Sequence, residues 1–152
     1  MFRGSSPITL DSKNRITIPT RYREELFADC QGKMVCTVDF QQPCLLLYPL
    51  PEWEEIELKL CGLSSMNPQE RALQQVLLGN ASECDIDKSG RLLINGPLRQ
   101  HASLDKNIML VGQLKKFEIW NEQAWQQQMQ QSIAKMRTGE VELTERLLDL
   151  SL

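Results

Sequence analysis

Two stretches of the sequence contain short runs in which apolar and β-branched residues flank a polar connection, a pattern typical of strands joined by turns. In the first stretch, Leu10 and Ile16 to Ile18 lie on either side of such a connection, and Pro19 ends the second strand. Further predicted strands are Lys33 to Val38, Cys44 to Tyr48, Ile108 to Gly112 and Lys116 to Trp120. Each stretch therefore predicts the order β-turn-β, helix, β-turn-β.

Apolar residues at helical spacing lie between these strands. Thr20 is positioned to cap a short helix over Arg21 to Phe27. A second helix opens at Pro51, and Asn67 caps a third that runs to Leu78. The second of these helices is predicted to carry its apolar stripe on Trp53, Ile56 and Leu60.

The C-terminal segment is rich in Gln, yet Trp125, Met129 and Ile133 follow one helical stripe. This stripe favours a true helix over a low-complexity tail, and we expect the helix to pack on the core or on a neighbouring subunit. Thr138-Gly139 interrupts it, and the residues beyond form a last weak helix or stay mobile.

The two strand-rich stretches are copies of one another. The segment LDSKNRITIP, Leu10 to Pro19, aligns with IDKSGRLLIN, Ile86 to Asn95. The aligned pairs are Asp11 with Asp87, Arg15 with Arg91, Ile16 with Leu92 and Ile18 with Ile94. Asn14 and Gly90 share one position, which predicts a left-handed turn residue used twice because both types tolerate positive φ. Each copy is about 45 residues long and the two are about 75 residues apart, as in an internal duplication.

Charge follows the duplication. The 152 residues include 17 Lys+Arg and 20 Asp+Glu, and the net charge of −3 excludes a uniformly basic nucleic-acid coat but allows a local basic patch. Residues 1–23 have five positive side chains against one negative, and residues 86–116 have six against two. A hydrophobic content of 41% with 24% charged residues is typical of a globular protein. No apolar run approaches the roughly 20 residues of a membrane span, and the N-terminus has no signal core, so we expect a cytosolic protein without a membrane partner.

The sequence offers little for catalysis or metal binding. The five cysteines are scattered without a CxxC, and His101 is the single imidazole. A Cys–His pairing is possible on paper, but nothing marks an activated thiolate, and no carboxylate pair or phosphate loop is present. We therefore expect small buried thiols in a reducing compartment, no metal, no cofactor, no small-molecule ligand and no enzymatic activity.

The duplicated Asp-x-x-x-Arg motif suits nucleic-acid binding. An Arg just after a tight turn can present its guanidinium to a phosphate or to a guanine edge. The Asp four residues earlier can orient that Arg by a charge-assisted hydrogen bond. The candidate DNA-binding residues are Arg15, Lys13, Arg3, Arg21, Arg23, Arg91 and Lys88, and the candidate loop-orienting residues are Asp11, Asn14, Asp87 and Gly90. The alternative is that the two Asp–Arg pairs only lock their hairpins, or that Arg21 and Arg23 are merely solvated.

The sequence resembles the MraZ family, whose members resemble two fused AbrB-type swapped-hairpin modules. The matching stretches are RGSSPITLDSKNRITIPTRYRE, CLLLYPLPEWE, ASECDIDKSGRLLI and GQLKKFEIW. The resemblance implies an α+β fold in which two pseudo-symmetric β-hairpin/helix/β-hairpin repeats pack as one small β-barrel-like core with peripheral helices. The expected organisation is a first repeat at residues 5–52, a helical linker at 53–80, a second repeat at 81–124 and a helical tail at 125–152. The second copy departs from the first in having Asn95-Gly96-Pro97 after its strand, so the two helices need not start alike.

The resemblance further implies a nucleoid-associated bacterial regulator that binds double-stranded DNA upstream of its own operon in the division and cell-wall gene cluster. We expect a repressor that acts as a ring-like homo-oligomer on tandem short DNA repeats. The alternative is an antitoxin-like or scaffold protein whose main role is to bind a partner protein, with the acidic helix from Glu52 to Glu57 as its docking face.

Overall fold

The computed structural model describes all residues from 1 to 152. The elements are β1 (Ser5–Thr9), β2 (Arg15–Thr17), α1 (Thr20–Cys30), β3 (Met34–Val38), β4 (Leu45–Pro49), α2 (Leu50–Cys61), α3 (Pro68–Gly79), β5 (Ser82–Glu83), β6 (Arg91–Leu93), α4 (Gly96–His101), β7 (Asn107–Gln113), β8 (Lys116–Asn121), α5 (Glu122–Thr138) and α6 (Glu145–Leu148). The chain divides into two compact units, Met1–Glu122 and Gln123–Leu152. The finer division into repeats, linker and tail stays a prediction.

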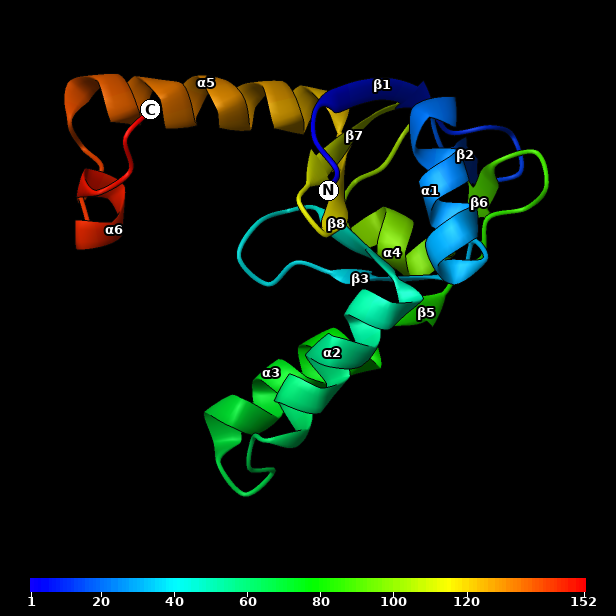
Figure 1. Cartoon of the computed structure of the whole chain (residues 1–152), viewed down its shortest axis with the longest axis horizontal. Coiled ribbons are helices and arrows are strands. Elements are labelled where there is room, and N and C mark those ends of the chain that lie inside the picture. Colours follow the sequence, from blue (N-terminus) through cyan, green and yellow to red (C-terminus); the bar gives the residue numbers. More distant parts are fainter. The chain divides into compact units, whose positions relative to one another are not determined.

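The first unit contains a six-stranded sheet and a separate two-stranded ribbon, as Figure 1 shows. The sheet has the order β1-β7-β8-β4-β3-β5, and the ribbon consists of β2 and β6. All pairs are antiparallel. Exchanging β1 with β5, β3 with β7, and β4 with β8 leaves the strand order of the sheet unchanged, and the same exchange relates β2 to β6. The predicted α+β fold of two pseudo-symmetric repeats is therefore confirmed.

The repeats are swapped into one another. β1 pairs with β7 of the second repeat, β5 pairs with β3 of the first, and β2 pairs with β6 across the two. Within each predicted β-turn-β unit, the strands separate just beyond the turn, which is closed by the Asp11 N–H donating to the Arg15 carbonyl at 2.9 Å. Neither repeat can complete its own strand pairing, so the two copies fold as one body.

The main hydrophobic core lies between the ribbon and the sheet. Ile16, Ile18, Leu92 and Ile94 are fully buried against sheet residues such as Phe117. The opposite face of the sheet carries a smaller cluster in which Trp53 of α2 packs on Val35, Leu46 and Tyr48. The apolar residues that align in the two copies are thus the ones that join the two repeats in the core.

The helices that follow the ribbon strands begin differently, as Asn95-Gly96-Pro97 predicted. In α4 the Asn95 side chain accepts a hydrogen bond from the Leu98 N–H at 3.0 Å. The prediction that Thr20 caps α1 is wrong, because the N-cap is Pro19 and no side chain accepts a bond there. Pro19 fixes an extended entry, with φ −55° and ψ 142°, and Thr20 already belongs to the first turn.

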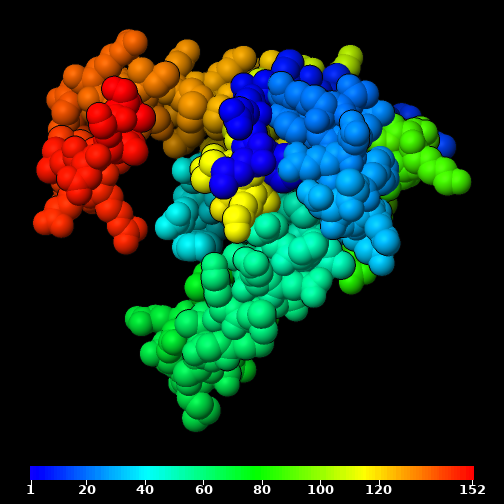
Figure 2. All heavy atoms as spheres, in the orientation of Figure 1, coloured from blue at the N-terminus to red at the C-terminus, as the bar shows by residue number.

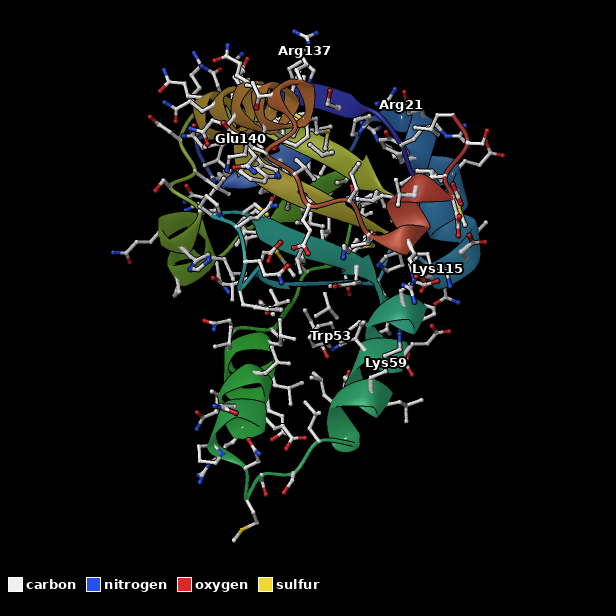
Figure 3. The ribbon with its side chains drawn as sticks, turned by 90° about the vertical axis from the view of Figure 1, so that its left-hand side faces the viewer. Arg21, Trp53, Lys59, Lys115, Arg137 and Glu140 are labelled. Carbon is white, nitrogen blue, oxygen red and sulfur yellow. The ribbon has the colours of Figure 1, made fainter.

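α2 and α3 form a helical hairpin that projects from the sheet (Figures 1 and 3). Asn67 caps α3 as predicted, with its side chain accepting from the N–H groups of Gln69 and Glu70. Gln74 of α3 donates to the Leu60 carbonyl at 3.0 Å, which ties the two helices together.

The second unit consists of α5, the short α6 and the residues around them. α5 ends at Thr138, just before Gly139, as the sequence predicted. None of the helices in the structure has the length and apolar character that a bilayer span requires.

Candidate nucleic-acid interface

Each Asp-x-x-x-Arg motif forms a tight turn held by the same set of hydrogen bonds. Asp11 Oδ1 accepts from the backbone N–H groups of Lys13 and Arg15, both at 2.9 Å, and Asp11 Oδ2 accepts from Arg15 Nε at 3.0 Å. Asp87 Oδ1 accepts the equivalent backbone bonds at 2.8 and 2.9 Å, and its Oδ2 accepts from Arg91 Nε at 3.2 Å. Each aspartate thus hydrogen-bonds the side chain of its own arginine, and its role in orienting that arginine for a ligand stays a prediction.

These bonds stabilise the ionised aspartates. The pKa of Asp11 is lowered chiefly because the Arg15 backbone N–H donates to its carboxylate, with further help from Lys13 and the Arg15 side chain. The pKa of Asp87 is lowered for the same reason, with the Arg91 N–H as the main donor. Each aspartate engages its arginine through Nε, which leaves the two terminal amino groups of each guanidinium for a ligand.

The turns share a left-handed residue, and this residue links them to each other. Asn14 has φ 63° and Gly90 has φ 80°, so the predicted left-handed position is present in both copies. The Gly90 carbonyl accepts from the Ile18 N–H at 2.8 Å, and the Asn14 carbonyl accepts from the Ile94 N–H at 3.1 Å. Each turn is thereby anchored to the strand end of the other repeat, and the two turns emerge together beside β2 and β6 (Figure 1).

The β2–β6 ribbon places both arginines on one outer face. In its register, Arg15 lies opposite Leu93 and Arg91 lies opposite Thr17, while the central pair of Ile16 and Leu92 is completely buried. Because alternate residues of a strand point to opposite faces, the four flanking residues share the outward face. Lys13 and Lys88 are exposed at the turns that lead into the two strands. Figure 2 shows the N-terminal and central parts of the chain, blue and green, meeting at this edge of the surface.

Arg23 is hydrogen-bonded to the backbone beside the turns and is not a freely solvated side chain. Its Nε donates to the Ile18 carbonyl at 2.7 Å, and a Cβ added at Gly90 would come within 2.2 Å of that Nε. Arg99 of α4 makes the matching bond to the Ile94 carbonyl. Sequence reasoning missed Arg99, although a signal was available. It follows Arg91 by the same eight residues that separate Arg23 from Arg15.

The remaining candidates are tied to the N-terminal strand. Arg21 donates to the Ser6 hydroxyl of β1 and lies over the Tyr22 ring, with 4.7 Å from its guanidinium carbon to the ring centroid (Figure 3). The Tyr22 hydroxyl donates to the backbone carbonyl of Arg3. The structure thus brings Lys13, Arg15, Lys88 and Arg91 to the two linked turns, whereas Arg3 and Arg21 lie at β1 and α1.

The cysteines lie outside these turns. Four of the five cysteines are buried and Cys61 is exposed. Burial raises the pKa values of the Cys30 and Cys44 thiols, which disfavours the reactive thiolate. No group of three or more His, Cys, Asp or Glu side chains is arranged to hold a metal ion.

The fold and this site define a class of proteins in which two hairpin repeats are swapped around a shared ribbon with paired arginines. The sequence matches the family described as "MraZ protein, putative antitoxin-like" twice, over residues 1–76 and 77–147. The chain belongs to the MraZ family.

Full-length relatives carry the same family name. The chain is 84% identical to a protein of Colwellia psychrerythraea named "Transcriptional regulator MraZ", over 152 residues and the whole of both chains. Proteins of the same name from Pseudoalteromonas atlantica and Yersinia pseudotuberculosis are 66% and 61% identical, again over the whole of both chains. These names support regulation of transcription as the general function of this chain.

Proposed function

We propose that this chain is a sequence-specific DNA-binding regulator that inserts its β2–β6 ribbon into the major groove of double-stranded DNA. The single observation that carries the proposal is the shared outer face on which Arg15 and Arg91 lie, each oriented by its own aspartate. A two-stranded ribbon fits the major groove, where an Arg can donate two hydrogen bonds to a guanine edge. Lys13 and Lys88 at the turns are suited to phosphate contacts, which position the protein without reading sequence.

The two halves of the ribbon differ in their surroundings. The second turn follows Glu83 and Asp85, both exposed, whereas Asp11 is the one acidic residue in the sequence before the first turn. Carboxylates within a Debye length of about 8–10 Å repel a phosphate backbone. The first turn is therefore the principal DNA contact, and Arg15 contributes more to binding than Arg91.

In the cell, the proposed target is the DNA upstream of the protein's own operon in the division and cell-wall gene cluster. The proposed effect is repression, exerted by a nucleoid-associated, ring-like homo-oligomer on tandem short repeats. A protein of net charge −3 with few cations at each ribbon binds DNA weakly as a single copy. Several tethered copies multiply such a weak site through effective concentration.

The test is a salt titration by fluorescence anisotropy, using the upstream DNA and a scrambled duplex of equal length. If phosphate contacts from several subunits lead binding, an array of about 6–10 contacts predicts a loss of roughly 10³–10⁵-fold in affinity between 50 and 200 mM salt. We expect the upstream DNA to be retained better than the scrambled duplex throughout. A flat salt dependence or equal affinity for both duplexes would contradict the proposal.

The antitoxin-like wording of the family description favours one alternative, capture of a partner protein. The acidic start of α2 is the surface that this alternative would use, and Glu54, Glu55 and Glu57 are exposed there, while Glu52 pairs with Lys115 at 3.8 Å. Neutralising these three exposed glutamates separates the two functions, because DNA binding through the ribbon should persist.

A further inference from the structure

The outer face of the ribbon has one break in its symmetry. The pseudo-twofold relation exchanges Arg15 with Arg91 and places Thr17 in the position of Leu93. Thr17 is an exposed polar residue, whereas the Leu93 side chain is apolar and 55% exposed. The two arginines thus have different cross-strand neighbours, with Arg15 opposite Leu93 and Arg91 opposite Thr17.

Resting on the proposed DNA-binding function, we infer that Leu93 is a specificity-determining residue that contacts the 5-methyl group of a thymine. In the major groove, thymine is the base that presents a methyl group, and apolar side chains recognise it. Beside Arg91 the equivalent residue is Thr17, whose single methyl group next to a hydroxyl offers a thymine methyl much less apolar surface than a leucine does. The Leu93–Thr17 difference therefore gives the outer face of the ribbon a direction along the DNA, in addition to the difference in charge between the two turns.

The spacing of the ribbon fits this assignment. Residues directly opposite in an antiparallel pair have Cβ atoms about 4.5–5.5 Å apart, while successive bases along one DNA strand are about 3.4 Å apart. Arg15 and Leu93 can therefore reach the same base pair or neighbouring ones. The recognised thymine lies within one or two base pairs of the base that Arg15 contacts, and on one side only.

Directionality matters for a regulator on tandem repeats. A ribbon with a symmetric outer face binds a short site equally well in either orientation, so neighbouring subunits would gain nothing from repeats that all point the same way. A ribbon with one apolar corner favours one orientation. Leu93 is thus a feature of the outer face itself that matches this chain to direct repeats instead of palindromes.

The experiment starts from random duplex DNA selected by the wild-type chain. In the enriched sequence, each thymine is replaced singly by deoxyuridine, which removes only the 5-methyl group. Burying one such carbon changes the transfer free energy by about 0.8 kcal/mol, so we expect about a fourfold loss of affinity at one thymine position. The same replacements are then measured with Leu93→Ser, Leu93→Met and, as a control, Leu58→Ser on α2, where the leucine is 73% exposed.

The inference predicts that the deoxyuridine penalty vanishes in Leu93→Ser and persists in Leu93→Met and Leu58→Ser. A Leu93 that only packs beside the Arg15 stem would weaken binding without changing the response to the methyl group. A penalty that survives in folded Leu93→Ser, or the absence of a methyl-sensitive thymine for the wild-type chain, would overturn the inference and leave the proposed function intact. Failure of the wild-type chain to enrich any sequence would overturn both.

Discussion

At the scale of single residues, the site depends on an aspartate that has two structural roles in each turn. Asp11 shapes the backbone by accepting two N–H bonds with one oxygen and orients Arg15 with the other. The charge of the carboxylate strengthens all three bonds. An Asn at this position could still accept from the backbone but would hold the guanidinium less firmly, so the arginine would lose orientation before the turn lost its shape.

The contribution of these hydrogen bonds to stability depends on pH in the acidic range. Because the pKa values of Asp11 and Asp87 are lowered by their turns, the stability they contribute is complete above the ordinary aspartate pKa of about 3.9 and is lost as pH falls through the lowered values. We expect carboxyl NMR titrations of both residues to give midpoints below 3.9. Midpoints at or above the ordinary value would show that the turns are not held by the ionised side chains.

At the scale of elements, local patterns predicted the strands, the turns and most helices, whereas pairing required the structure. Asn14 and Gly90 predicted a turn because tolerance of positive φ is an intrinsic property of these two residue types. The pairing of β2 with β6 depends on residues far apart in the sequence, and the residues alone did not indicate it. Only the family resemblance implied the swap. The structural role of Arg99 was not predicted because it depends on a hydrogen bond to the Ile94 carbonyl, at the end of a strand of the same repeat.

At the turn of the second repeat, Gly90 is sensitive to substitution for two reasons. Ala would have to adopt φ 80° at a cost of about 1–2 kcal/mol, and its Cβ would displace Arg23 from beneath the turn. We expect Gly90→Ala to lower the urea unfolding midpoint accordingly. Gly79→Ala at the end of α3 is the control, because a Cβ there meets no atom within 4 Å and a helical Ala is stabilising or neutral. Equal midpoints for the two variants would contradict this account of the turn.

At the scale of the whole molecule, one chain offers a single ribbon with two oriented arginines. We therefore expect light scattering to show a homo-oligomer under the conditions in which the upstream DNA is bound, since tethering several ribbons supplies the affinity that one lacks. A monomer that binds its operator tightly would contradict this expectation.

The proposed function depends on the β2–β6 ribbon as the part of the protein that contacts DNA, with Arg15 as its principal contact. The most direct measurement is a gel-shift titration of Arg15→Ala and Arg91→Ala on the upstream DNA, with Arg71→Ala on the exposed face of α3 as the matched control. A loss of even roughly 1 kcal/mol at each subunit compounds over an oligomer, so Arg15→Ala should abolish specific binding while circular dichroism and size-exclusion profiles stay unchanged. Arg91→Ala should weaken binding less, and Arg71→Ala should bind like the wild type. Intact binding by a folded Arg15→Ala, or a larger loss from a folded Arg91→Ala, would contradict the central claim.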